Sequence, residues 1–174
     1  RDISSDDIVE GNKLTNFRQI AEQELERRGG HCQDIRAREI RAEQIDEDSL
    51  VLKETRYRTG IGDESFFEFV DSAARIAGFA RLSLPTRIAD LKELQGSAIL
   101  REVHVYGVAT ELGVRSVERT QHRGFGGKLV DAAKQRAQHE GFGSLAVISA
   151  VGTRNWYRRL GFEDGKLYQH LALS

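Results

Sequence analysis

Apolar and polar positions alternate in short runs between residues 49 and 106, a spacing that predicts β-strands. Glycines at 60 and 62 and the small residues 72–74 separate the first runs and favour hairpin turns. The polar stretch 86–96 favours a surface loop or a single helical turn. The predicted strands cover residues 49–59, 64–71, 75–83 and 98–106. This part of the chain is therefore expected to form an antiparallel meander.

After these strands the pattern changes to that of a helix followed by one more strand. Phe125, Leu129 and Ala133 recur at four-residue spacing, which predicts a helix over 125–140, and the apolar run 144–149 predicts a strand. Two strands joined through a helix by a right-handed crossover are parallel when they are neighbours. The expected fold class is α+β, with a mixed, mostly antiparallel sheet flanked by helices.

The beginning of the chain has a different pattern. A helix is predicted over residues 15–28, and it is ended by two glycines. Its stripe of apolar residues is enough to dock on another surface but not to fold alone. We therefore predict a connector over residues 1–42 and a main domain over residues 43–174.

A glycine-rich run, Gln121 to Gly127, immediately precedes the predicted long helix. Glycine at 124 and 126 removes side chains that would keep a ligand away from the backbone, so N–H groups at the helix N-terminus can point at phosphate oxygens. A tight turn without a ligand is the alternative. The spacing fits neither a Walker loop nor a dinucleotide fingerprint. The run therefore favours a pyrophosphate site of another type.

A second motif follows the last predicted strand. The stretch from Gly152 to Phe162 contains Asn155, Tyr157 and the ending Leu160-Gly-Phe. An ordinary amphipathic helix stopped by glycine would share these features. Because the motif follows the glycine-rich run and a strand, however, it resembles the closing helix of the GNAT acetyltransferase superfamily.

Three further segments narrow the resemblance. Residues 102–107, 121–126 and 147–157 are similar to the acetyltransferase domain of the Elongator catalytic subunit family, which modifies the wobble uridine of tRNA. Residues 7–19 and 32–39 resemble that family's connector between its radical-SAM and acetyltransferase domains. The resemblance implies the GNAT acyl-CoA N-acyltransferase fold, in which two parallel strands splay apart at the cofactor site and the pantetheine arm enters the gap.

The resemblance also assigns roles to individual residues. Tyr157 is expected to donate a hydrogen bond or proton to the departing thiolate, and Glu102 is the carboxylate available as a general base. The alternation around His104 favours a buried, hydrogen-bonded histidine over one that transfers protons. Acetyl-CoA is expected to contact Glu102, Val103, His104, Val105, Gln121, His122, Arg123, Gly124, Phe125, Gly126, Gly127, Asn155, Trp156 and Tyr157.

The implied function is that of an acetyl-CoA-binding domain in an enzyme that carboxymethylates C5 of wobble uridine 34, with acetyl-CoA hydrolysis stimulated by tRNA. A free-standing lysine or small-amine N-acetyltransferase and a non-catalytic RNA-binding or subunit-binding module are the alternatives. No Cys-x-x-x-Cys-x-x-Cys run occurs, so S-adenosylmethionine and a [4Fe-4S] cluster would be bound outside this chain. Expected partners are the anticodon region of tRNA, the radical-SAM domain of the same protein and other Elongator-type subunits.

The near-zero net charge, from 26 basic and 27 acidic residues, hides a local excess of arginine. Guanidinium groups suit phosphate recognition, although a solvated surface with compensating charges is the alternative. In an extended segment, Arg36 and Arg38 would project from one side. The residues expected to contact RNA are Arg27, Arg28, Arg36, Arg38, Arg154 and Arg158.

Composition limits the remaining possibilities. A single cysteine argues against a disulfide framework, and no long apolar run suggests a membrane span, so a soluble, cytoplasmic domain is expected. Cys32, with His31 and Asp34 nearby, falls short of the four ligands of structural zinc, so no metal site is predicted. The chain begins with Arg1 and has no methionine, so we expect it to be a piece of a longer product.

Overall fold

The structure, a computed structural model, describes residues 6, 9–11, 13, 17–40, 47–87, 90–106 and 122–173, with the backbone alone for residues 47, 122 and 123. The chain divides into two compact units, Arg1–Arg38 and Glu39–Ser174. Glu39 and Ile40 belong to the larger unit because Glu39 pairs with Ile76 and the Ile40 N–H donates to the Ile76 carbonyl at 3.0 Å. Gln121, an expected cofactor contact, lies outside the described residues.

The smaller unit contains a helix whose end was predicted from glycine. Helix α1 (Phe17–Arg27) has no buried residue. It closes at Gly29, which has φ +78°, and the Gly30 N–H donates back to the Leu25 carbonyl at 2.9 Å. Only glycine adopts this left-handed conformation without strain, so the two glycines end the helix as expected.

A second, short helix in this unit corrects one expectation. Asp34 accepts a hydrogen bond from the Ala37 N–H at 2.8 Å and pairs with Arg18 at 2.6 Å, so it caps helix α2 (Ile35–Arg38). The segment is therefore helical and not extended. Residues two apart on a helix point in different directions, so Arg36 and Arg38 do not project from one side.

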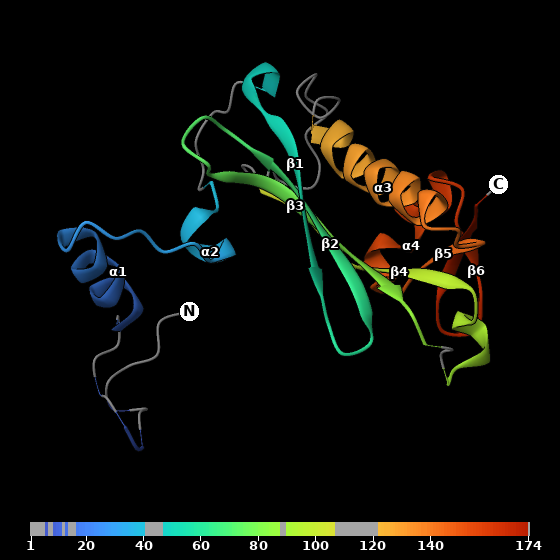
Figure 1. Ribbon diagram of the computed structural model, residues 1–174, viewed down its shortest axis with the longest axis horizontal. Coiled ribbons are helices and arrows are strands. Elements are labelled where there is room, and N and C mark those ends of the chain that lie inside the picture. The colour runs from blue at the N-terminus through green and yellow to red at the C-terminus, as the bar shows by residue number, and fades with distance from the viewer. Residues whose placement is uncertain are drawn as a thin grey trace. The chain divides into compact units, whose positions relative to one another are not determined.

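The larger unit is built on a seven-stranded sheet of order β1-β2-β3-β4-β5-β7-β6 within the described residues (Figure 1). All pairs are antiparallel except β4 and β5, which are parallel as the crossover predicts. The strands are β1 (Val51–Arg58), β2 (Gly62–Val70), β3 (Ile76–Pro85), β4 (Ser97–Val105), β5 (Ser144–Val147), β6 (Glu163–Asp164) and β7 (Gln169–Ala172). The four predicted meander strands are thus confirmed, as is the mixed, mostly antiparallel sheet.

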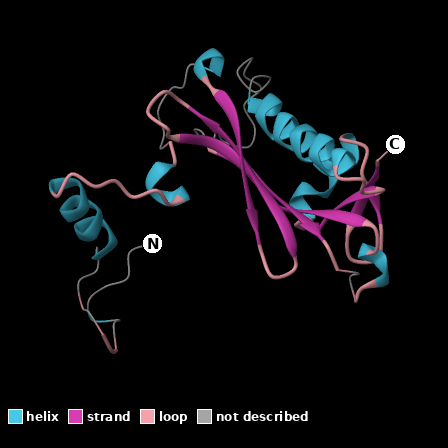
Figure 2. Cartoon of the chain, viewed as in Figure 1, coloured by secondary structure: helices cyan, strands magenta, loops and turns pink. Residues whose placement is uncertain are grey.

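Helix α3 (His122–His139) covers one face of this sheet and forms the core with it (Figure 2). Leu129, Ala133 and Ala137 are fully buried against the sheet, and the rings of Phe125 and Phe69 meet edge to face at 4.9 Å. The buried face repeats at the predicted four-residue spacing. Burial of this apolar stripe fixes α3 along the sheet and so fixes the position of its N-terminus.

Short elements complete the larger unit. They are η2 (Glu47–Ser49), η3 (Lys92–Leu94), η5 (Val151–Thr153) and helix α4 (Arg154–Arg159). The helical turn η3 lies within the stretch predicted as a loop or single turn. Strands β6 and β7 were not predicted, because β6 has only two residues and β7 begins with the polar Gln169 and His170, so neither shows the apolar run that reveals β5. Strand β7 pairs with β5 and makes it an interior strand.

Candidate active site

The candidate site begins where the parallel pairing of β4 and β5 stops. Their register runs from Ser97 opposite Ser144 to Leu100 opposite Val147, where β5 ends. Strand β4 continues to Val105, paired with β3 alone among the described residues. Alternate backbone groups on this half of β4 consequently point to the open side, as at the edge of a sheet.

A β-bulge at Arg101 decides which side chains face which way. Arg81 pairs with Glu102 and Leu82 with Leu100, so Arg101 is an extra residue on β4. Leu82 and Leu100 are fully buried beneath α3, and residues that alternate along a strand point to opposite faces. Glu102 therefore lies on the face opposite α3, where its carboxylate accepts a hydrogen bond from the Arg81 guanidinium at 2.9 Å.

The bulge also overturns the expectation for His104. Because it follows Glu102 by two positions, His104 lies on the same face, at the edge of the sheet. The imidazole is exposed and stacks on the Phe79 ring at 5.0 Å with an interplanar angle of 23°. The predicted buried histidine is therefore wrong.

Helix α3 begins at His122, three residues earlier than predicted, so its glycines lie in the first turns of the helix and not before it. A Cβ at Gly124 would meet only the Lys128 Cε, at 3.9 Å, which leaves open space beside the backbone. The first four N–H groups of a helix have no intrahelical partner and carry the positive end of its dipole. This end of α3 is therefore chemically suited to an anion.

Gly126 and Gly127 differ sharply in their surroundings. A Cβ at Gly126 would lie 3.0 Å from the Trp156 Cζ2 and 3.8 Å from the Val105 Cγ2, whereas a Cβ at Gly127 would meet nothing within 4 Å. Gly126 is thus required by close packing between α3, α4 and the open half of β4. The sequence suggested a ligand for this glycine, while the structure gives it a protein neighbour.

Tyr157 of α4 is buried to 7% exposure within the core. Its ring meets Trp156 at 4.7 Å and Phe162 at 5.3 Å, both edge to face. In the part of the chain that is described, its hydroxyl has no hydrogen-bond partner. Burial raises the pKa of the Tyr157 hydroxyl to about 12, so at neutral pH it is a proton and hydrogen-bond donor.

The end of α4 has the predicted features of the closing helix. The Phe162 N–H donates to the Tyr157 carbonyl at 3.1 Å, and Gly161 has φ +92°. Asn155 is exposed, and its side chain accepts a hydrogen bond from Arg158 at 2.6 Å. The Gly161–Phe162 turn therefore closes α4 next to Tyr157, while the Asn155 hydrogen bond lies within the helix.

The arginines expected to contact RNA are distributed over both units. In the smaller unit, Arg27 and Arg28 pair with Glu24, each at 2.7 Å, and Arg36 is exposed on α2. In the larger unit, Arg158 pairs with Asp164, and the Arg154 carbonyl accepts from Gln169 at 3.3 Å. Arg27, Arg28 and Arg158 are therefore already paired with carboxylates of their own unit.

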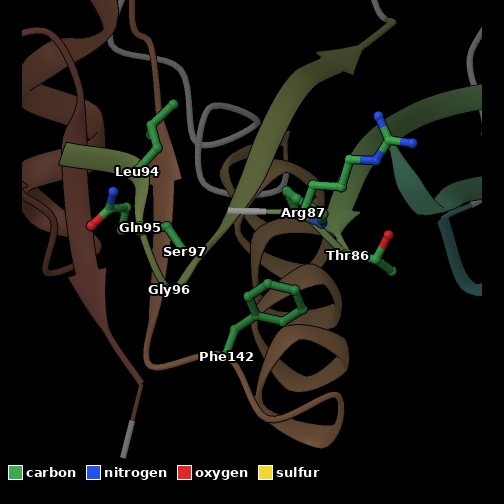
Figure 3. Close-up of a pocket in the computed structure, with 8 residues that line it drawn as sticks. Thr86, Arg87, Leu94, Gln95, Gly96, Ser97 and Phe142 are labelled. Carbon is green, nitrogen blue, oxygen red and sulfur yellow. The ribbon is translucent and has the colours of Figure 1, made fainter. Parts of the chain in front are cut away.

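One cavity lies away from this site. It has a volume of about 330 Å³ and is found at the start of β4, the opposite end from Glu102 to Val105 (Figure 3). Its lining comes from three separate segments, and no predicted site residue belongs to it. The lining residues are Pro85, Thr86, Arg87, Leu94, Gln95, Gly96, Ser97 and Phe142.

Two kinds of feature are absent from the described residues. No group of three or more His, Cys, Asp or Glu side chains in these ranges is arranged to hold a metal ion. No helix among them is long and apolar enough to cross a membrane.

Two parallel strands stop pairing beside the N-terminus of a helix, and the next helix carries a buried tyrosine. This combination defines the acyl-CoA acyltransferase class of fold. The chain belongs to the acetyltransferase (GNAT) family, whose model matches residues 32–162. The predicted GNAT fold is thus confirmed.

Individual relatives narrow the similarity. The chain is 35% identical over 170 residues to Elongator complex protein 3 of Danio rerio. The aligned region covers 94% of this chain and 31% of the relative. The chain is also 36% identical over 180 residues to the tRNA uridine(34) acetyltransferase of Dehalococcoides mccartyi, which covers 98% of this chain and 39% of the relative. The chain thus spans about a third of the length of these relatives, and the predicted resemblance to the Elongator catalytic subunit family is confirmed.

A solved structure agrees with these relatives. The archaeal Methanocaldococcus infernus Elp3 with an N-terminal deletion superposes with a TM-score of 0.76 at 29% identity, over 99% of this chain and 43% of that one. The similarity therefore extends beyond residues 32–162 to nearly the whole chain.

Proposed function

We propose that this chain is the acetyl-CoA-binding domain of an enzyme that modifies C5 of the wobble uridine of tRNA. The observation that carries the proposal is the position of the open half of β4, which pairs with β3 alone among the described residues. It lies close to the start of α3 and to α4, because Gly126 packs against both Trp156 and Val105. The names of the relatives, Elongator complex protein 3 and tRNA uridine(34) acetyltransferase, support the substrate.

Three parts of the site bind the cofactor in this proposal. The free N–H groups at the start of α3, which begins at His122, hold the pyrophosphate. The open backbone edge from Glu102 to Val105 hydrogen-bonds the pantetheine amides in the manner of an added strand. Asn155, Trp156 and Tyr157 close the pocket around the thioester.

Acetyl-CoA supplies an acetyl group already activated as a thioester. In hydrolysis, the carbon–sulfur bond breaks, the oxygen of water bonds to the acetyl carbon, and the products are acetate and the CoA thiol. Tyr157 donates a hydrogen bond or its proton to the departing sulfur, and its raised pKa keeps that proton in place at neutral pH. Solvent then restores the proton to the tyrosine.

The complete tRNA modification needs more than this chain. With one cysteine, its residues cannot hold a [4Fe-4S] cluster, so we assign that cluster, S-adenosylmethionine and the carboxymethylation chemistry to a radical-SAM domain of the same protein, acting in the cytoplasm. Other Elongator-type subunits are further proposed partners. The anticodon region of tRNA would be held by the exposed arginines, among which Arg36 has no ion-pair partner in the described residues.

One observation favours a second candidate, an amine N-acetyltransferase. Glu102 projects from the open half of β4 and is 38% exposed in its side chain, which suits a base that deprotonates an ammonium group. Its carboxylate already accepts a hydrogen bond from Arg81, however, and an ammonium group would have to displace this partner. We therefore rank this function second.

The test measures thiol release from acetyl-CoA with and without tRNA, for the wild type and for Tyr157→Phe. We expect tRNA to stimulate release and Tyr157→Phe to lower it by about 10²- to 10⁴-fold. Tyr168→Phe, a half-buried tyrosine whose ring lies against His170, is the matched control and should keep wild-type release.

Other outcomes would redirect the assignment. Release that depends on a primary amine and not on tRNA would favour the amine N-acetyltransferase. Thiol release that is unchanged by tRNA and by Tyr157→Phe would contradict the proposal. An absence of acetyl-CoA binding by calorimetry would favour a non-catalytic RNA- or subunit-binding module.

A further inference from the structure

A row of aromatic rings lies on the sheet face opposite α3 and ends at the open edge of β4. Phe66 on β2 and Phe79 on β3 have ring centroids 5.2 Å apart, and Phe79 stacks on His104 of β4 at 5.0 Å. Tyr106 lies 6.2 Å from the Phe79 ring. None of these rings takes part in the cofactor contacts or in thiol release as proposed above, so their arrangement has no assigned role.

The row differs from a core cluster in its exposure. Phe79 is only 4% exposed and is held between its neighbours, whereas the imidazole of His104 is exposed although one of its faces stacks on Phe79. Part of the imidazole outside this stack is consequently accessible to solvent. A flat, exposed ring backed by a fixed one is the arrangement on which unpaired bases of RNA stack.

The position of His104 relates the row to the acetyl group. Two residues of a strand span about 7 Å, so His104 lies about that far along β4 from Glu102 on the same face. The ion pair of Glu102 with Arg81 lies two register positions from the pair of His104 with Phe79, and it presents both hydrogen-bond acceptors and donors. A base stacked on His104 would lie beside the unpaired half of β4, where the thioester is proposed to bind.

We propose that His104, backed by Phe79, is the platform on which the wobble uracil stacks next to the acetyl group. The inference rests on the proposed function, because it takes the acceptor to be a base of tRNA. It adds an acceptor subsite of defined chemistry, a planar pyrimidine, to the cofactor site. His104 acts here through its ring face, as a binding residue.

The test compares two anticodon stem-loop RNAs that differ only at the wobble position, one with uracil and one abasic. For the wild-type chain we expect the abasic RNA to bind roughly 5- to 100-fold more weakly, the range of one base-stacking contact. His104→Ala should bind both RNAs equally. His104→Phe, which keeps a flat ring, should restore the preference for uracil, and the exposed His139→Ala on α3 should leave it unchanged.

Either of two results would overturn the proposal: no preference in the wild type, or an unchanged preference in His104→Ala. Failure of His104→Phe to restore the preference would also contradict stacking as the mechanism. Because the readout is RNA binding and not thiol release, a chain that binds uracil on His104 but releases no thiol would refute the proposed function alone. A chain that releases thiol under tRNA control without a His104 effect would refute this inference alone.

Discussion

The first half of β4, Ser97 to Leu100, is hydrogen-bonded to strands on both sides, while the second half, Glu102 to Val105, is bonded to β3 alone. The first half is mostly buried, whereas in the second half Glu102 and Val103 are half-buried and His104 and Val105 are exposed. One strand therefore serves two purposes. Where it is paired twice it stabilises the sheet, and where it loses one partner its backbone and side chains become available to ligands.

Deletion of Val103 should have the largest effect on this contrast. Without it, either Glu102 or His104 takes its place opposite Ala80 and turns toward α3. Burying a polar side chain there should lower the free energy of unfolding by on the order of 2–5 kcal/mol, as measured by urea denaturation. Arg101→Ala keeps the register and removes only a 3.7 Å ion pair with Glu64, so it should unfold like the wild type. Equal stability of the deletion and Arg101→Ala would contradict the assignment of faces along β4.

The second largest effect is expected when one apolar residue in each half of β4 is truncated, because the two truncations should differ in their cost to stability. Leu100 is fully buried, so Leu100→Ala should lower the free energy of unfolding by about 2–5 kcal/mol. Val105 is 38% exposed, so Val105→Ala should cost less than about 1 kcal/mol. Equilibrium denaturation of both variants measures the difference. Similar costs for the two would show that the open half contributes to stability as much as the closed half.

Enlarging Gly126 tests the packing beside the open half. Because a Cβ there lies 3.0 Å from Trp156, Gly126→Val should destabilise the chain by about 1–3 kcal/mol and weaken acetyl-CoA binding. Gly127→Ala fills open space within α3 and should stabilise by about 0.5–1 kcal/mol. Thermal unfolding and calorimetry with acetyl-CoA measure both effects. A harmless Gly126→Val would mean that Trp156 is free to move aside.

Alkaline titration tests the burial of Tyr157. An unfolded tyrosine ionises near pH 10 and the folded Tyr157 near 12, so the folded state holds its proton longer. This contribution to stability is fully present below pH 10 and is lost as pH rises toward 12, on the order of 2 kcal/mol. The free energy of unfolding should therefore fall more steeply over this range in the wild type than in Tyr157→Phe. Parallel curves for the two proteins would contradict the burial.

The smallest effect is expected far from β4, at the ion pair between β1 and α3. Desolvation raises the pKa of the Glu54 carboxyl, but the hydrogen bonds from Arg136 and Ser65 and the charges of Arg136 and Arg56 together outweigh it, so the pKa is lowered. The stabilisation is therefore present above the unfolded value of about 4.5 and is lost as pH falls. Glu54→Gln should cost about 1 kcal/mol at pH 7 and progressively less below pH 4.5 in urea denaturation. A cost that does not change with pH would rule out the charge as its source.

Much of the fold follows from the local pattern of apolar and polar residues, and the elements that this pattern does not predict have physical explanations. The meander strands and α3 carry enough alternating or four-residue repeats to be recognised within a few residues. Strands β6 and β7 lack that signal, and α2 is formed by one capping carboxylate, Asp34. Start and end points of elements depend on such single contacts, which a repeating pattern does not record.

Site residues that belong to a sequence motif could be predicted. Residues whose orientation or neighbours depend on tertiary contacts could not be predicted as well. The resemblance of its motif, with the Leu160-Gly-Phe ending, to the GNAT closing helix identifies Tyr157 as a candidate, and its ring is buried in the core. His104 was misjudged because its side depends on the bulge, although two consecutive polar residues, Arg101 and Glu102, are a usable signal of one. The contact of Gly126 with Trp156 joins residues thirty positions apart and has no trace in local sequence.

That same contact gives the protein an optical probe of its own. Trp156 is the chain's single tryptophan, and its indole lies against Gly126 at the opening of α3 and against the ring of Tyr157. All indole fluorescence of the chain therefore originates between the proposed pyrophosphate turn and the proposed catalytic hydroxyl. Its emission should respond directly to occupancy of the site, without any added label.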